Sequence, residues 1–263
     1  MRNFTFKRQL LFVMFILLGC LSIQAADDDL ITKQITIKLD EAGTLPNRIS
    51  ESKKYLITNL KIVGYVNGTD WRFIREMAGC DCKGKKTDGK LSILDLSDAR
   101  IVKGGLPYLY FDHGSFEEEM NTSYDKLGYL AFEGCSSLTS LTIPSSVTSI
   151  GNYTFWGCSG LTSIYVYLEK LPNLGTDVFY RCDAKNCTVY VPTGTYDDYK
   201  LSEFGYFENI VEFDATGIDK VTTSNDTKEL SRYSVNGQRL SAPAKGLNIV
   251  KYSDGSVKKV VVQ

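Results

Sequence analysis

The spacing of the cysteines and the presence of a single histidine are the features of this sequence that say most about catalysis and metal binding. Cys80-Asp81-Cys82 has the close spacing of a redox pair or of half a metal site. Such metal sites have a second ligand pair with matching spacing, and the sequence contains none. The single histidine, His113, argues against a histidine-based triad and a multi-histidine metal site. We interpret the cysteine pair as part of a loop that tolerates thiols, and we predict no catalytic residue, no metal ligand and no cofactor.

Acidic residues offer two further candidate sites. Asp95 and Asp98 could form the carboxylate pair of a hydrolase, but no feature of the sequence places them against a pocket. The segment 103–124 brings His113 close to the run Glu117–Glu119, which could form a binding loop or a metal site. We favour surface aspartates in the first case and a solvated excursion from the fold in the second.

Three other cysteines recur at regular intervals. Cys135, Cys158 and Cys182 follow one another at spacings of 23 and 24 residues. We expect them to stack as a ladder of buried, reduced thiols, because buried cysteine behaves as a small hydrophobe. If the protein is exported, disulfides are permitted, and Cys182 with Cys187 is the pair that we expect to form one.

The longest pattern in the chain is a 23-residue repeat between Leu127 and Tyr167. Glycine, phenylalanine, cysteine and aliphatic positions all keep this period, and a looser third copy follows. A fixed period in this range is typical of solenoids, in which each unit buries its apolar side against its neighbours. The matched pairs are Gly128 and Gly151, Phe132 and Phe155, Gly134 and Gly157, Cys135 and Cys158, Leu138 and Leu161, Leu141 and Ile164, and Ile143 and Val166; the third copy keeps Gly175, Phe179 and Cys182.

Each unit contains two kinds of segment. Leu138-x-x-Leu141-x-Ile143 ends in alternation, which predicts a short strand with one buried face, and Pro144 ends it. Phe132 and Phe155 belong to the back of the coil and are expected to fill its interior. One coil therefore consists of a strand, a turn, a back segment that carries an aromatic residue, and a second turn.

The segment CSSLTSLTIPSSVTSIGNYTFWGCSGLTSI resembles the BspA-like class of leucine-rich repeats, with a specific match from Leu127 to Val166. That class occurs in surface proteins of gut and oral anaerobes. The resemblance implies an α/β solenoid, a right-handed coil with a parallel β-sheet, without a catalytic centre and with binding or adhesion as its usual role.

The repeat pattern predicts a domain organisation along the exported chain. Residues 26–55 form an N-terminal cap, 56–175 the solenoid and 176–213 a C-terminal cap. Strands are expected at Leu60, Leu94, Leu141, Ile164 and Val189. The 47 residues between Leu94 and Leu141 correspond to about two repeats with one insertion. Asp70–Ala78 predicts a helix capped by Asp70, and Tyr196–Phe207 a short amphipathic helix.

The first 25 residues have the features of a signal peptide. Arg2, Lys7 and Arg8 precede an apolar run that is too short to span a bilayer. Cleavage before Ala26 is the route that we favour, and the alternative is a lipobox that would leave Cys20 lipidated. Either route predicts export, and we expect the protein at the cell surface or outer membrane, with an extracellular location as the alternative.

The C-terminal part has a different composition. Residues 214–229 are polar and predict a linker, and 230–263 predict a small all-β domain with a hairpin at Asn236-Gly237. Residues 228–263 contain seven basic and two acidic groups. The motifs YSVNGQRL, KGLNIV and KKVVV resemble the C-terminal sorting domains of type IX secretion, which implies the export machinery as a partner. The alternative is an accessory hairpin domain.

Charge and strand pattern together indicate a function. With 30 basic and 31 acidic residues, the chain is not a generally basic nucleic-acid binder. We expect a non-enzymatic protein that binds a protein or glycan ligand, such as a component of host extracellular matrix. A structural scaffold or spacer without its own ligand is the alternative, and an enzyme is the least favoured class.

Alternation along the strands assigns the candidate binding residues. Side chains between the buried aliphatic positions must face the open, concave side of the sheet. Tyrosines suit a recognition surface because they combine apolar area with a polar tip. Alternatively, they cover the sheet where the C-terminal cap folds over it. The candidate ligand-binding residues are Tyr165, Tyr167, Tyr190, Thr142, Ser163 and Asp95.

Overall fold

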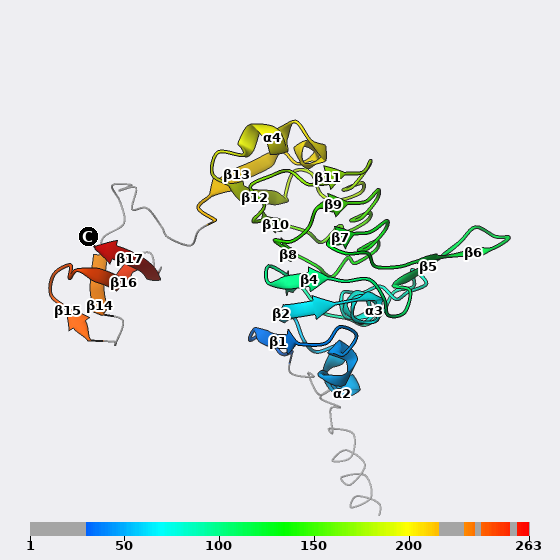
Figure 1. Ribbon diagram of the computed structural model, residues 1–263, viewed down its shortest axis with the longest axis horizontal. Helices are drawn as coiled ribbons and strands as arrows, with labels where there is room; N and C mark the ends of the chain where they lie inside the picture. Colours follow the sequence, from blue (N-terminus) through cyan, green and yellow to red (C-terminus); the bar gives the residue numbers. More distant parts are fainter. Residues whose placement is uncertain (1–29, 216–228, 235–237, 253–256, 263) are drawn as a thin grey trace, which may run out of the picture.

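A computed structural model describes residues 30–215, 229–234, 238–252 and 257–262. Its largest element is an eight-stranded sheet with the order β1-β2-β3-β8-β10-β12-β13, in which β4 also pairs with β2 (Figure 1). Every pair in this sheet is parallel. The strands are β1 (Ile35–Leu39), β2 (Asn59–Val66), β3 (Ile93–Asp95), β4 (Ala99–Ile101), β8 (Ser140–Ile143), β10 (Ser163–Val166), β12 (Thr188–Pro192) and β13 (Asn209–Phe213).

The strands lie in the register that the repeat pattern predicts. Leu60 pairs with Leu94, and the row continues through Leu141 and Ile164 to Val189. All five side chains are buried. The leucine-rich repeats and the parallel sheet are thus confirmed, while β1, β4 and β13 extend the sheet beyond the five predicted strands.

The predicted count of about two repeats between Leu94 and Leu141 is wrong, whereas the predicted insertion is present. The two residues are direct partners in adjacent strands, so the interval is a single step of the sheet. Its extra length contains β4 and the antiparallel hairpin of β5 (Leu109–Asp112) and β6 (Glu117–Met120), and the short strand β7 (Lys126–Leu127) then begins the regular repeat. The hairpin projects from the coil, on the side away from the large sheet (Figure 1).

The N-terminal end of the coil contains helices in place of a repeat. After η1 (Leu45–Asn47) and α2 (Glu51–Lys54), helix α3 (Gly68–Met77) buries Trp71, Ile74 and Met77 on one face. The predicted cap at Asp70 is wrong by one turn. Asn67 is the N-cap, and Asp70 is the third helical residue of a capping box that accepts from the Asn67 backbone N–H. Asp70 also accepts from the N–H groups of Gly43 and Leu45.

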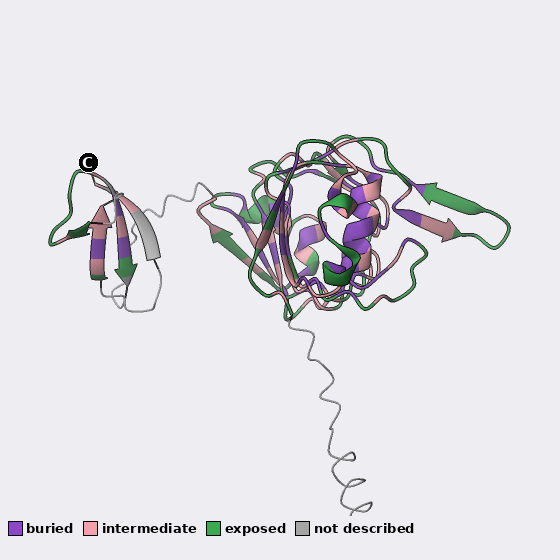
Figure 2. Ribbon diagram, turned by 90° about the horizontal axis from the view of Figure 1, so that it is seen from below, coloured by how far each residue is buried: buried purple, intermediate pink, exposed green. Residues whose placement is uncertain are grey.

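The back segments stack through a ladder of phenylalanines. Phe132 and Phe155 have ring centroids 5.4 Å apart, as do Phe155 and Phe179, with nearly parallel planes at 11° and 3°. All three side chains are at most 1% exposed, which confirms the predicted ladder. Figure 2 shows how the buried positions gather inside the coil. A small parallel sheet of β7, β9 (Ser149–Ile150) and β11 (Asn173–Leu174) precedes these back segments.

Backbone hydrogen bonds join successive back segments. The N–H groups of Leu130, Phe132 and Gly134 donate to the carbonyls of residues 152, 154 and 156 in the next coil. The N–H groups of residues 153, 155 and 157 repeat the pattern toward 176, 178 and 180. We call these bonds the rungs. The stack therefore presents carbonyl oxygens at its N-terminal end and N–H groups at its C-terminal end.

Side chains hydrogen-bond the backbone groups at both ends of the rungs, with donors at the carbonyl end and an acceptor at the N–H end. At the N-terminal end, Trp71 Nε1 donates to the Ala131 carbonyl at 3.0 Å, and Arg75 donates to the carbonyls of Leu130, Ala131 and Glu133. At the other end, the backbone N–H of Val178 donates to the Glu203 carboxylate at 3.3 Å. Helix α3 thus supplies the donors that a preceding coil would have supplied.

The C-terminal end of the coil contains two short helices, α4 (Tyr196–Lys200) and η2 (Glu203–Tyr206). The prediction of one continuous helix over Tyr196–Phe207 is therefore wrong. Ser202 separates them, since its extended backbone begins η2 and its Oγ accepts from the Phe204 N–H. Strand β13 then pairs with β12 and forms one end of the sheet order.

A separate four-stranded antiparallel sheet lies near the C-terminus of the chain. It has the order β15-β14-β16-β17 and consists of β14 (Glu229–Ser234), β15 (Arg239–Leu240), β16 (Gly246–Tyr252) and β17 (Val257–Val262). The predicted hairpin pairing of β14 with β15 is present, with Arg232 opposite Leu240. The turn at Asn236-Gly237 itself lies outside the described residues.

Candidate ligand-binding face

The large sheet has a face whose side chains point away from the core, and we call it the open face. Register places its residues in two rows that cross the strands. The candidate binding residues Asp95, Thr142, Tyr165 and Tyr190 share one row, and Ser163 belongs to the other. The rows are Lys61, Asp95, Thr142, Tyr165, Tyr190 and Val211, and Asn59, Ile93, Ser140, Ser163, Thr188 and Asn209.

Aromatic rings occupy the C-terminal part of the open face. Tyr165 and Tyr190 stack with ring centroids 4.5 Å apart and planes within 7°, which confirms that they are near neighbours. Phe213 meets both Tyr165 and Tyr167 edge-on, at 6.4 and 5.1 Å. Each ring is held by at least one other ring, so the group is preorganised. We call Tyr165, Tyr167, Tyr190 and Phe213 the tyrosine cluster.

Two members of this surface were not assigned to it from the sequence. Val211 lies beside Tyr190 in register and is 46% exposed, and Phe213 completes the tyrosine cluster. The alternation in Ile210-Val211-Glu212-Phe213 could have identified them, had the segment been placed parallel to β12. That placement depends on α4 and η2, which do not follow the repeat.

The middle of the open face is lined by small hydroxyl groups. Thr142, Ser140 and Ser163 are neighbours on β8 and β10, and all three are half-buried. Each hydroxyl can donate and accept a hydrogen bond. This part can therefore hydrogen-bond a ligand that rests against the adjacent tyrosine cluster.

A cation held by two carboxylates lies next along the open face. Lys61 Nζ is 3.0 Å from Asp95 Oδ2 and 2.7 Å from Asp98 Oδ2. Burial lowers the pKa of Lys61, but hydrogen bonds to Asp98 and Asp95 outweigh it and leave the pKa raised. Burial raises the pKa of Asp95, but hydrogen bonds from Ser97 and Lys61 outweigh this effect and leave the pKa lowered. Both aspartates are therefore ion-pair partners of Lys61. The lowered pKa keeps Asp95 ionised, whereas a general acid must carry a proton.

The other candidate for chemistry, His113, lies on the β5–β6 hairpin. Its Nε2 is 3.1 Å from Glu118 Oε2, and its ring stacks on Phe116. Glu117 pairs instead with Lys83 at 3.5 Å. Among the residues that the structure describes, no group of three histidine, cysteine, aspartate or glutamate side chains could hold a metal ion.

The cysteines are buried free thiols throughout the described residues. The expected disulfide between Cys182 and Cys187 is therefore wrong for this structure. Cys182 instead belongs to the ladder, where its Sγ donates to the Phe155 carbonyl at 3.3 Å, as Cys158 does to Phe132 at 3.0 Å. Burial raises the pKa of Cys80 to about 11 and of Cys182 to about 12, so neither is a reactive thiolate at neutral pH.

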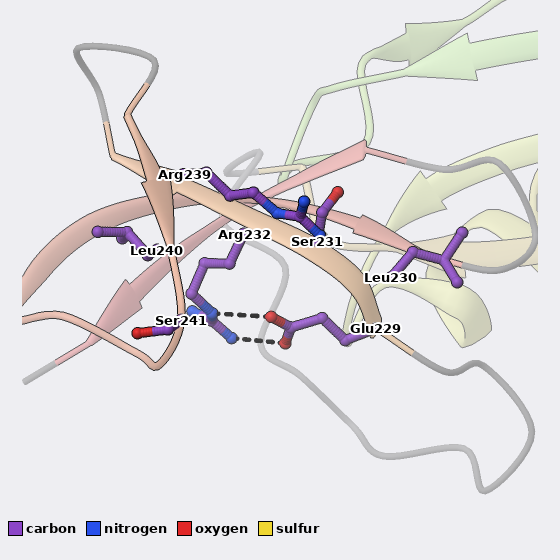
Figure 3. A pocket seen from close by; sticks show the side chains of 7 residues that line it. All are labelled: Glu229, Leu230, Ser231, Arg232, Arg239, Leu240 and Ser241. Carbon is purple, nitrogen blue, oxygen red and sulfur yellow. Dashed lines mark hydrogen bonds and ion pairs between the residues drawn. The ribbon is translucent and has the colours of Figure 1, made fainter.

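The C-terminal sheet carries a shallow hollow of about 520 Å³. Figure 3 shows Arg232 and Glu229, two of its lining residues, joined by two hydrogen bonds of 3.0 and 2.8 Å. A third bond links Arg232 Nη1 to Asn248 Oδ1 at 3.2 Å. These bonds fix the arginine within the sheet, so we assign it a structural role.

The predicted signal peptide, residues 1–25, and the candidate lipidation site Cys20 lie outside the described residues. Within the described residues, we find no helix of the length and apolarity needed to cross a membrane. Both export routes therefore stay predictions from the sequence.

Comparison with known proteins bears on the coil alone. No curated protein matches the chain. A family model does match, over residues 117–204 of the 263, in six copies. Proteins with such repeats are typically surface-associated or secreted and non-enzymatic. Residues 117–204, which include β8, β10 and β12, are similar to the family described as the BspA type Leucine rich repeat region.

Proposed function

We propose that this protein is a non-enzymatic bacterial cell-surface protein that binds a protein or glycan ligand through the open face of its large sheet. The tyrosine cluster is the observation that carries the proposal. Stacked and edge-on contacts hold its four rings in place before any ligand arrives, which lowers the entropy that binding must cost. Tyr167 and Val211 remain 37% and 46% exposed beside it.

The composition of the open face supports recognition of a ligand with both apolar and polar groups. The tyrosine cluster supplies apolar area, the half-buried hydroxyls supply hydrogen bonds, and the Lys61–Asp95 pair supplies paired charge. Interfaces commonly combine aromatic anchors with such a polar surround.

Replacement of three tyrosines tests the proposal. A Tyr165→Ala, Tyr167→Ala, Tyr190→Ala protein is compared with the unmodified protein on immobilised extracellular-matrix proteins and on a glycan array. We expect affinity for the captured ligand to fall about a hundredfold, the loss typical of an anchor group. A Tyr196→Ala protein is the control, because this tyrosine is 41% exposed and has a position off both rows. Circular dichroism must first show that each variant is folded.

A structural scaffold without its own ligand is the second candidate. The edge-on contacts of Phe213 with Tyr165 and Tyr167 favour it, since they are also what a cover for the end of the sheet would need. Unchanged affinity in the folded triple variant would assign the tyrosines to this structural role. The segment 103–124 would then be the next candidate for ligand contact.

Export and surface attachment belong to the same proposal. Mass spectrometry of the mature protein distinguishes the routes. An N-terminus at Ala26 together with loss of residues from the C-terminal sheet supports handling as a type IX sorting domain. A lipidated Cys20 with the C-terminal sheet intact would support a lipoprotein instead.

A further inference from the structure

A second set of aromatic rings lies on the back of the coil, outside the phenylalanine ladder. Four of its members, Tyr129, Tyr153, Trp156 and Tyr180, come from the back segments that contain Phe132, Phe155 and Phe179. Three more, Phe111, His113 and Phe116, come from the β5–β6 hairpin. We call these seven rings the outer row.

Ring contacts connect the outer row without a break. On the hairpin, Phe116 and His113 stack at 4.6 Å, and His113 meets Phe111 at 5.0 Å. Phe111 then contacts Tyr129 at 6.3 Å, which joins the hairpin to the coil. Along the coil, Tyr129 and Tyr153, Tyr153 and Trp156, and Trp156 and Tyr180 are 6.1, 5.8 and 6.4 Å apart. The outer row is therefore one continuous series of rings that runs from the hairpin onto the back of several coils.

The outer row is anchored on one side and open on the other. Phe111, Tyr129, Tyr153 and Trp156 are partly buried and pack against the core. Phe116 and Tyr180, near the two ends, are 60% and 46% exposed. The phenylalanine ladder already fills the interior, since Phe132 and Phe155 are completely buried. The exposed part of the outer row is therefore not needed to fill the interior of the coil. Exposed aromatic side chains that form a contiguous group commonly mark a binding surface.

Charged groups of both signs lie beside the outer row. His113 pairs with Glu118 at 3.1 Å, and Arg181 lies over the rings of Trp156 and Tyr180 at 5.9 and 5.7 Å. The negative charge of Asp177 raises the pKa of Tyr153. Proteins that stack nucleic-acid bases on aromatic rings also need a cationic groove for the phosphates. The outer row carries both signs of charge and has no such groove, which favours a neutral partner.

We propose that the outer row is a second binding site, separate from the open face, and that it takes a neutral linear polysaccharide. Sugar rings have apolar C–H faces that lie against aromatic rings and hydroxyl rims that form hydrogen bonds. Tyrosine hydroxyls and the carboxylates of Glu118 and Asp177 lie beside the rings to receive them. A chain of sugars matches a continuous series of rings, because successive sugars can meet successive rings.

Tryptophan fluorescence tests the proposal directly. The chain has two tryptophans; Trp71 is 1% exposed, whereas Trp156 lies in the outer row. Acrylamide quenching of tryptophan fluorescence, measured on the chain from Ala26 to Gln263, therefore reports on Trp156. The probes are cello-, xylo-, manno- and chito-oligosaccharides of two to six sugars, with oligogalacturonate and single-stranded DNA as charged comparisons. We expect a neutral series to protect Trp156, with affinity that increases with oligomer length.

Two variants locate the site. Tyr180→Ala is expected to weaken the hexasaccharide about tenfold, and Phe116→Ala to weaken the hexasaccharide more than the disaccharide. Tyr65→Ala is the matched control, because Tyr65 is also 46% exposed and makes no ring contact among the described residues.

Several outcomes would overturn the proposal. They are failure of every neutral oligomer to protect Trp156 at millimolar concentration, preference for oligogalacturonate or DNA, and equal affinities in folded Tyr180→Ala and Tyr65→Ala. The Tyr165→Ala, Tyr167→Ala, Tyr190→Ala protein is expected to retain full protection of Trp156. If the outer row fails these tests, the open-face proposal is unaffected. If the open face fails its own test, the outer-row proposal is likewise unaffected.

Discussion

Arg75 provides the sharpest test of how the solenoid begins. Its guanidinium is completely buried and donates to the carbonyls of Leu130, Ala131, Glu133 and Asp81, at distances of 3.0 to 3.3 Å. The carbonyls of Ala131 and Glu133 lie at the N-terminal end of the rungs, since they occupy the positions of residues 154 and 156 in the next coil. If side-chain donors replace a missing coil, removing them must destabilise the whole stack.

The size of the effect follows from the bonds that are lost. In Arg75→Met the apolar stem is kept, and Ala131 retains its bond from Trp71. The Glu133 carbonyl loses its donor, at about 1 to 1.5 kcal/mol. The carbonyls of Leu130 and Asp81 lose one bond but keep a backbone N–H donor each, from Glu133 at 3.0 Å and from Gly84 at 3.3 Å, so each of these losses is smaller. The variant no longer buries a cation, which recovers part of this loss. We therefore expect the free energy of unfolding to fall by about 1 to 3 kcal/mol.

Urea unfolding followed by circular dichroism measures this change. Arg72→Met is the matched control on the same helix, because the Arg72 side chain is 32% exposed and contacts Glu76 only at 3.8 Å. It should lower stability by less than about 0.5 kcal/mol. Arg75→Lys keeps the charge without the planar fork and should fall between the two. A loss below about 1 kcal/mol for Arg75→Met, with an unchanged m-value, would show that water satisfies these carbonyls and would refute the reasoning.

Three further predictions concern the repeats. Phe155→Ala should cost about 3 to 5 kcal/mol of unfolding free energy, because Phe155 is fully buried between two rings; a loss below about 1 kcal/mol would contradict its role in the ladder. Arg181→Gly should raise the urea midpoint by the equivalent of about 1 kcal/mol, since Arg181 has φ 64° where Gly134 and Gly157 have 71° and 72°; an unchanged midpoint would mean that its ring contacts offset the strain. The thiols of the coil should resist an aromatic disulfide reagent at pH 8 until the protein unfolds, and fast labelling of the native protein would contradict their burial. Because burial raises the pKa of Cys135 from 9.0 to about 12, its contribution to stability is present below pH 9 and is lost as pH rises toward 12.

Much of the coil could be predicted from the sequence because its interior repeats. Phe132, Phe155 and Phe179 share one position, and parallel strands in register bring like positions together, so their stacking followed from spacing. The same reasoning placed Tyr165 beside Tyr190. These predictions needed no knowledge of the ends of the coil.

The parts of the coil that do not repeat, namely the inserted hairpin and the two ends, departed from the predictions. The hairpin lengthens one coil without adding a strand to the large sheet, so the distance from Leu94 to Leu141 gave a wrong repeat count. Phe213 joins the tyrosine cluster through a strand whose position depends on α4 and η2. In the sequence Arg75 looks like an ordinary helical residue, because three of its four carbonyl partners lie 55 to 58 residues away along the chain.

Inward and outward positions of the coil differ in how freely they can vary. The inward Phe132, Phe155 and Phe179 must stack on their own kind, and Cys158 and Cys182 hydrogen-bond the coil before them. No such constraint acts on the outward positions, which change from coil to coil. Thr142 is followed by Tyr165 and Tyr190 on the open face, and Glu133 by Trp156 and Tyr180 on the back. Both changes lead to aromatic side chains toward the C-terminal coils. Aromatic area thus accumulates on two opposite surfaces of the same coils, where stacking inside the solenoid does not require it and a ligand could use it.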